Sequence, residues 1–246
     1  SDRVALFQAA SGKAMMNLRQ ATQANKVSWT VVAAAGADWA QKVFPDVAAD
    51  EAQDKLWDQI FKTTRIYEED PVAAWKKHDE TLQVKAEALN KEQFSALHYT
   101  APGTDLTIGL PKNHLWEGAG SYNARNEKFM ANMPTEEVFT APDARRIDGY
   151  ISSTKPLSYA GTIISGMTFT FKDGKVVDFS AEQGEEVLGK LLAIDEGAKS
   201  LGEVALVPDP SPISQSGIIF FNTLFDENAS NHLALGSAYA FSLQGG

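Results

Sequence analysis

The stretch TFTFKDGKVVDF, residues 168–179, decides the fold class of the second part of the chain. Two runs rich in β-branched and aromatic residues flank Asp173-Gly174, and Asp-Gly suits a two-residue hairpin turn because both positions accept a positive φ. The sequence therefore predicts an antiparallel β-hairpin. Other strand-like runs are FSALHYTAP (94–102), TDLTIGL (104–110), RIDGYISS (146–153), GEVALVP (202–208) and IIFFN (218–222).

A single predicted helix interrupts this β pattern. GEEVLGKLLAIDEGAKS, residues 184–200, has Leu188, Leu191 and Leu192 at helical spacing on one side. We therefore predict that residues 93–246 form a β-rich domain with one inserted helix.

Residues 1–92 have a different pattern. Apolar spacing predicts helices over 2–25, 36–44, 51–66 and 71–90. The continuously apolar VSWTVVAA, residues 27–34, predicts a strand buried on both faces. We interpret this part as the end of an α/β N-terminal domain plus connecting helices. The predicted fold class of the whole chain is α/β (α+β).

Composition excludes several classes of protein. The 246 residues are 43% hydrophobic, which is enough for a sizeable core, and carry a net charge of −10. This acidic balance argues against a nucleic-acid or anionic-membrane partner. No signal peptide or membrane-length apolar run is visible, so we expect a cytoplasmic protein. Because there is no cysteine, any metal site must use carboxylates and the four histidines.

The segment FDENASNHLALG, residues 225–236, contains one candidate pair of metal ligands, Glu227 and His232. Residues five apart on a helix are rotated by roughly 140°, so the pair would not share a helical face and is not an HExxH site. A turn entering a strand could bring both side chains to one ion. The alternative is a polar loop without metal.

Other polar residues stand in unusual settings. Glu203 interrupts an apolar strand, where a buried carboxylate requires a partner or a metal, although strict alternation would place it on a solvated face. Glu136 and Glu137 precede the apolar run that begins at Val138. Tyr239 is either a core residue or a hydrogen-bond donor into a site. Trp116 and Tyr122 could stack on a sugar or lipid, or pack within their loop.

Taken in order, five blocks of sequence resemble one family, the M29 metalloaminopeptidases, the family of aminopeptidase T, aminopeptidase S and PepS. The blocks are NMPTEEVFTAPD (132–143), STKPLSYAGTII (153–164), FKDGKVVDFSAEQGEEVL (171–188), LGEVALVP (201–208) and FNTLFDENASNHLALGSAY (221–239). WTVVAAAGADWAQKVFP, residues 29–45, is similar to the end of the family's N-terminal domain.

The resemblance implies a metal-dependent aminopeptidase that removes N-terminal residues from peptides with two divalent ions, Zn²⁺, Co²⁺ or Mn²⁺. It implies metal ligands at Glu137, Glu203, Glu227 and His232, with Glu203 bridging the two ions. Tyr239 matches the tyrosine that contacts the substrate carbonyl. Glu136 matches no ligand and is only a candidate for proton transfer. The resemblance also implies a homodimer and peptide substrates with a free N-terminus.

The resemblance further implies that both ends of the family's sequence are absent from this chain. Family members carry a His-x-Asp motif beyond the position of Gly246, and this motif completes the metal site. A second hypothesis follows, in which a truncated chain binds no metal and serves only as a folding, dimerisation or interaction module. The first hypothesis predicts that Glu137, Glu203, Glu227 and His232 converge. Bound metal and peptidase activity in this chain would rule out the second.

Overall fold

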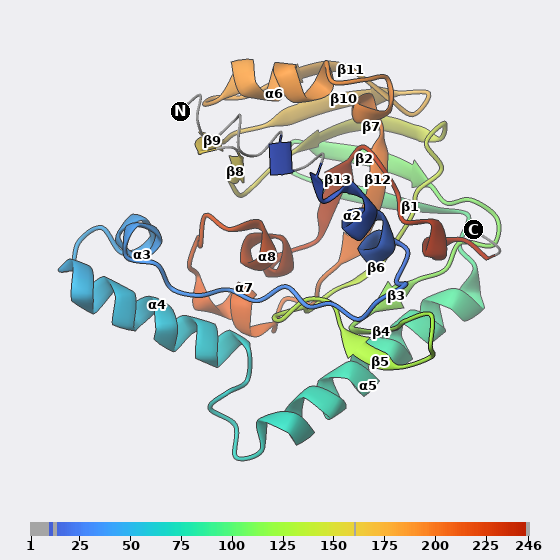
Figure 1. Ribbon diagram of the computed structural model, residues 1–246. Coiled ribbons are helices and arrows are strands. Elements are labelled where there is room, and N and C mark those ends of the chain that lie inside the picture. Colours follow the sequence, from blue (N-terminus) through green and yellow to red (C-terminus); the bar gives the residue numbers. More distant parts are fainter. Residues whose placement is uncertain (1–9, 12–13, 160, 245–246) are drawn as a thin grey trace.

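The computed structural model describes residues 10–11, 14–159 and 161–244 (Figure 1). The described part before residue 93 is mainly helical and the strands follow residue 93, as the sequence predicts, but short helices accompany the single inserted helix expected there. The first helices are α2 (Met16–Gln23), α3 (Ala37–Val43), α4 (Ala49–Thr63) and α5 (Pro71–Glu92). The start of the helix predicted over 2–25 lies outside the described residues.

Local sequence explains how α5 begins and how the main hairpin turns. The Asp70 side chain accepts a hydrogen bond from Ala73 N, and Pro71 occupies the first turn, where its missing N–H is not needed. The predicted Asp173-Gly174 turn is confirmed, because both residues have a positive φ, 49° and 83°. It joins β10 (Thr168–Lys172) to β11 (Lys175–Ser180).

A five-stranded antiparallel sheet contains this hairpin and has the order β1-β2-β7-β10-β11. Its other strands are β1 (Ala96–Ala101), β2 (Thr104–Gly109) and β7 (Ile147–Ser152). The inserted helix α6 (Glu185–Leu192) lies along the β10–β11 side at the top of Figure 1. Leu188 and Leu192 of α6 are buried with Ile164 and pack against Phe179. This helix is shorter than predicted, and a 3₁₀ turn, η1 (Gly197–Lys199), follows it.

A four-stranded antiparallel sheet has the order β13-β12-β6-β3 and runs through the middle of the molecule (Figure 1). Its strands are β3 (Glu117–Gly118), β6 (Val138–Thr140), β12 (Leu201–Leu206) and β13 (His232–Leu235). The main hydrophobic core joins the two sheets and α5, because it contains Leu106 and Ile147 from one sheet, Val138 and Val204 from the other, and Leu82 from the helix.

Two small hairpins complete the strands. They are β4 (Gly120–Tyr122) with β5 (Lys128–Met130), and β8 (Leu157–Tyr159) with β9 (Thr162–Ile164). Trp116 is buried in the main core with 1% of its surface exposed, so it neither stacks on a ligand nor packs within its loop alone, whereas Tyr122 is exposed. Among the described residues, no helix combines the length and apolar character needed to cross a membrane.

A second core lies among helices. It joins α3 and α4 to α7 (Pro212–Ser216) and α8 (Thr223–Asp226), with Leu56, Phe220 and Phe225 fully buried. Both this core and the main one contain residues from each side of residue 93. The change of secondary structure at residue 93 is confirmed, whereas its role as a domain boundary stays a prediction.

Two predicted strands are wrong. Residues 27–34 form only a single bridge, Val31 to Asn132, and Val32 is 63% exposed, because no neighbouring strand within the described part of the chain covers them. Residues 218–222 form no strand either. There the Asp226 carboxylate accepts hydrogen bonds from Phe220 N and Asn222 N, which takes the donors that a sheet would use.

Candidate metal centre

The register of the four-stranded sheet determines which side chains share a face. Ala205 on β12 lies opposite His232 on β13 and opposite Phe139 on β6. Directly opposed residues in an antiparallel pair point to the same face, and so do residues two apart on one strand. Glu203 therefore shares the face of Ala205 and His232, and Glu137 shares the face of Phe139.

The opposite face of this sheet enters the main core through Val138 and Val204, which are 4% and 0% exposed. A β-bulge between Leu201 and Glu203 interrupts the regular alternation of side chains along β12. Without it, these two residues would point the same way. The bulge turns Leu201 into the core while Glu203 remains on the other face, as bulges commonly re-aim side chains.

Three of the four predicted ligands come together on this face. One donor atom from each of Glu137, Glu203 and His232 lies within 4.8 Å of the others. His232 Nε2 is 2.8 Å from Glu137 Oε2 and 3.7 Å from Glu203 Oε1. Donor atoms that share one ion at about 2.1 Å are separated by roughly 3.0 to 3.4 Å. The two observed distances from His232 Nε2, 2.8 Å and 3.7 Å, lie just below and just above that range.

Two of these atoms lack any other partner. Glu137 Oε2 and His232 Nε2 are buried and have no hydrogen bond of normal geometry within the described part of the chain. Buried polar atoms without partners are rare because they cost desolvation energy. His232 Nδ1 lies 3.1 Å from Ser230 O, so a proton on Nδ1 would be donated there and Nε2 would be left as a ligand. The set of carboxylates and imidazole fits Zn²⁺, Co²⁺ or Mn²⁺.

Charge is crowded at this site. Burial opposes the charged form of His232, but the nearby carboxylates of Glu137 and Glu203 outweigh burial and raise the pKa of His232 to about 11. Burial, followed by the negative charge of Glu137, raises the pKa of Glu227 to about 8. A divalent cation would relieve this excess of negative charge. Glu227 lies at the start of η2 (Glu227–Ala229) and is not among the three converging donors in the described residues, so its role as a ligand stays a prediction.

Glu227→Gln should stabilise the protein in EDTA at neutral and alkaline pH. A folded-state pKa of about 8, above the ordinary 4.5, means that the folded state binds more protons, so stability falls as pH rises from about 4.5 to 8. Glutamine carries no charge and removes this penalty. The free energy of unfolding should therefore rise by on the order of 2 kcal/mol, once the coupling among the neighbouring carboxylates is discounted. Urea unfolding of both proteins at pH 5 and pH 8 measures the effect. A difference that does not change with pH would contradict it.

Tyr239 lies near the face that carries the three converging donors. Its ring stacks on Phe241 at 4.9 Å between centroids and lies 6.1 Å from Phe139, which shares the ligand face. Burial, then the charges of Glu203, Glu227 and Glu137, raise the pKa of Tyr239, so its hydroxyl keeps its proton near neutral pH. A protonated hydroxyl can donate a hydrogen bond into the site. The residue is 37% exposed, which leaves it accessible to a substrate.

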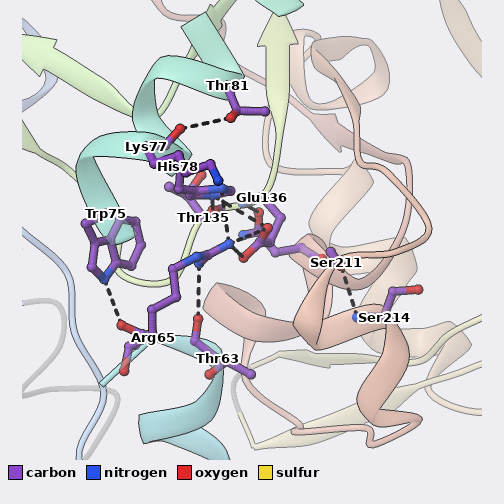
Figure 2. A network of polar contacts seen from close by, with 12 residues as sticks. Thr63, Arg65, Trp75, Lys77, His78, Thr81, Thr135, Glu136, Ser211 and Ser214 are labelled. Atoms are coloured by element: carbon purple, nitrogen blue, oxygen red, sulfur yellow. Dashed lines mark hydrogen bonds and ion pairs between the residues drawn. The ribbon is translucent and has the colours of Figure 1, made fainter. Parts of the chain in front are cut away.

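Glu136 has different partners from its neighbour Glu137. Its carboxylate is 2.8 Å from Arg65 Nη2 and 3.5 Å from His78 Nε2, in the polar network of Figure 2. Burial raises the pKa of Glu136 although Arg65 opposes this. Nothing in this arrangement brings Glu136 to the three converging donors, and its role in proton transfer stays a prediction. No sequence pattern singles out Arg65 or His78 as a partner of Glu136.

Several known proteins are similar to this chain. Aminopeptidase PepS of Streptococcus thermophilus is 65% identical and aminopeptidase AmpS of Bacillus subtilis (strain 168) is 59% identical, each over 246 residues. Both alignments cover 100% of this chain and 60% of the relative. The solved structure of wild-type AmpT from Thermus thermophilus superposes with a TM-score of 0.93 at 43% identity, with 100% of this chain and 60% of that chain covered.

The chain thus spans about 60% of the length of the curated relatives that it matches. The mixed arrangement of helices and antiparallel sheets agrees with that of AmpT. All of residues 1–246 match the family described as thermophilic metalloprotease (M29), and the chain belongs to this family.

Proposed function

We propose that the protein containing this chain is a metal-dependent aminopeptidase and that the face of the four-stranded sheet described above forms part of its catalytic centre. The convergence of Glu137, Glu203 and His232 carries the proposal, because two of the three contribute buried donor atoms without other partners. Membership of a metalloprotease family and similarity to proteins named aminopeptidases support it. As the chain spans 60% of these relatives, the activity proposed is that of the full-length protein.

Divalent ions at such a site would polarise the scissile carbonyl and lower the pKa of a water molecule. Glu137 and His232 would hold one ion from a buried position. The Glu203 side chain is 19% exposed, which suits a carboxylate that also reaches a second ion. A His-x-Asp motif beyond residue 246, expected from the resemblance, would supply further ligands. Glu227 would join them once a cation offsets its raised pKa.

The chain's own residues would orient the peptide. The carboxylates of the site attract the free α-ammonium group of an N-terminal residue. Tyr239 would donate its hydroxyl hydrogen to the oxygen that becomes negative as the carbonyl is attacked. The second metal ion, the homodimer and the cytoplasmic location stay predictions.

Purified full-length protein tests the proposal directly. It should contain bound divalent metal by elemental analysis and hydrolyse an amino-acid anilide such as leucine p-nitroanilide. EDTA should abolish this activity, and Zn²⁺, Co²⁺ or Mn²⁺ should restore it, because the ligands are carboxylates and an imidazole. N-acetyl-leucine p-nitroanilide, which has no free ammonium group, should not be hydrolysed. Metal-free protein with full activity would refute the metal dependence. Purified protein that binds no divalent metal and hydrolyses no anilide would instead favour a non-catalytic interaction module.

A further inference from the structure

A buried cluster of Arg65, His78 and Glu136 lies outside the converging ligands. Their side chains are 13%, 12% and 3% exposed. The three come from separate parts of the chain: the turn after α4, helix α5 and the segment that leads into β6. Figure 2 shows the Arg65 guanidinium directed toward both His78 and Glu136. The proposed mechanism leaves this cluster without a role.

Arg65 has an unusual backbone conformation. Its φ is 61°, a left-handed value that side chains other than glycine rarely adopt and that persists only where the surroundings enforce it. Arg65 Nη1 donates to Thr63 O at 3.4 Å, and the guanidinium lies 5.1 Å from the centre of the Trp75 ring. These contacts hold the guanidinium in one direction, toward Glu136.

The backbone that precedes Glu137 is held by side chains from other elements. Glu137 comes before β6 begins at Val138, outside the part of this segment that strand pairing holds. His78 Nδ1 faces Arg65 Nη2 at 3.1 Å and therefore accepts, which leaves the proton on Nε2 to be donated to Thr135 O at 2.7 Å. Arg65 Nη2 donates to Glu136 Oε2 at 3.1 Å and lies 2.8 Å from Glu136 Oε1.

Asn228 holds the same segment from the other side. Its Oδ1 accepts from Glu136 N at 2.7 Å, and its Nδ2 donates to Leu224 O at 3.1 Å. Asn228 is fully buried and adjoins Glu227, so one side chain links the segment of Glu137 to the segment of Glu227. Two predicted ligand segments thus depend on one set of buried contacts.

We propose that Arg65 is a positioning residue that fixes the Glu137 carboxylate for metal binding, acting through Glu136 and through the backbone held by His78. The proposal rests on the proposed function. Some residues orient a metal ligand through hydrogen bonds without touching the metal. Replacing such a residue typically lowers metal affinity or activity by about 10- to 100-fold.

The test uses the full-length protein and three variants. Arg65→Gln removes the guanidinium, whereas the double variant Arg65→Gln with Glu136→Gln also removes the buried charge that would otherwise lose its partner. Asp79→Asn is the matched control. This variant breaks the ion pair between Asp79 and Lys128, which also anchors α5. Asp79 follows His78 in the sequence, but its side chain makes no hydrogen bond or ion pair with Thr135 or Glu136 among the described residues.

Affinity for Zn²⁺ is measured by competition with a chelator, at a temperature where circular dichroism shows each variant folded. Arg65→Gln and the double variant should bind Zn²⁺ about 10- to 100-fold more weakly and lose kcat with little change in KM. Asp79→Asn should lose thermal stability but keep wild-type affinity for Zn²⁺. If Arg65→Gln does not fold, the double variant decides.

A second readout needs no metal. In EDTA, hydrogen exchange over residues 133–138 should be faster in the Arg65 variants than in wild type and unchanged in Asp79→Asn. Wild-type Zn²⁺ affinity and wild-type exchange in a folded Arg65 variant would overturn the inference. Failure of the proposed function would appear differently, as wild-type protein that binds no divalent metal and hydrolyses no anilide.

Discussion

Glu203→Gln in the full-length protein is expected to lower kcat/KM for amino-acid anilides by about three orders of magnitude or more. A thousandfold loss corresponds to about 4 kcal/mol of transition-state stabilisation. Glutamine keeps the shape of the side chain but removes the charge that would hold two cations close together. Glu203 Oε1 is 3.7 Å from His232 Nε2, and the two residues share a face of the sheet. The substitution therefore alters one of the converging donor atoms.

The fold should survive the Glu203→Gln change. The substitution relieves repulsion among neighbouring carboxylates, and the core face of β12, with Val204, is untouched. Circular dichroism in EDTA should match wild type, while elemental analysis should show less bound metal. Glu196→Gln is the control, because the Glu196 side chain is 83% exposed and its carboxylate pairs with Lys199 at the surface. Full activity in Glu203→Gln would remove this residue from the site.

Tyr239→Phe is expected to lower kcat by about 10²- to 10³-fold, the usual cost of removing one hydrogen-bond donor from a developing oxyanion. KM and metal content should change little, because the hydroxyl acts mainly in the transition state. The phenylalanine ring can keep the stacking on Phe241, so the loss would come from the hydroxyl alone.

The control for Tyr239→Phe is Tyr150→Phe, which removes a hydroxyl from an exposed residue of the five-stranded sheet. Steady-state kinetics with the same anilide should show wild-type values for this control. An equal fall of kcat in both variants, or a rise of KM without a fall of kcat in Tyr239→Phe, would contradict the proposed role of Tyr239.

Local patterns predicted elements wherever one residue type dictates the backbone. Asp173-Gly174 needs a positive φ at both positions, and Pro71 after Asp70 suits a helix start, so both features could be recognised without tertiary information. Residues 218–222 show the limit. Their apolar run is typical of a strand, but the Asp226 side chain binds their backbone and directs Phe220 into a helical core.

The metal site shows a similar division. The sequence blocks identified the family, and the residue types defined the chemistry available to a metal. The spacing of Glu227 and His232 left open whether they bind an ion or form a polar turn. The structure brings His232 to Glu137 and Glu203 and leaves Glu227 outside that set of three donors among the described residues, although burial and the negative charges of Glu137 and Glu203 raise the pKa of Glu227.

By itself, the sequence determined the family, the change from helices to strands near residue 93, and the acidic and histidine side chains on which the proposed chemistry depends. Only the tertiary structure decided which of them meet. Predicted ligands distant in sequence share a face because of strand register and a bulge beside Glu203, and Arg65 reaches the segment of Glu137 only through packing. Long-range contacts of this kind leave no periodicity in the local sequence, which is the physical reason that the pattern could not reveal them.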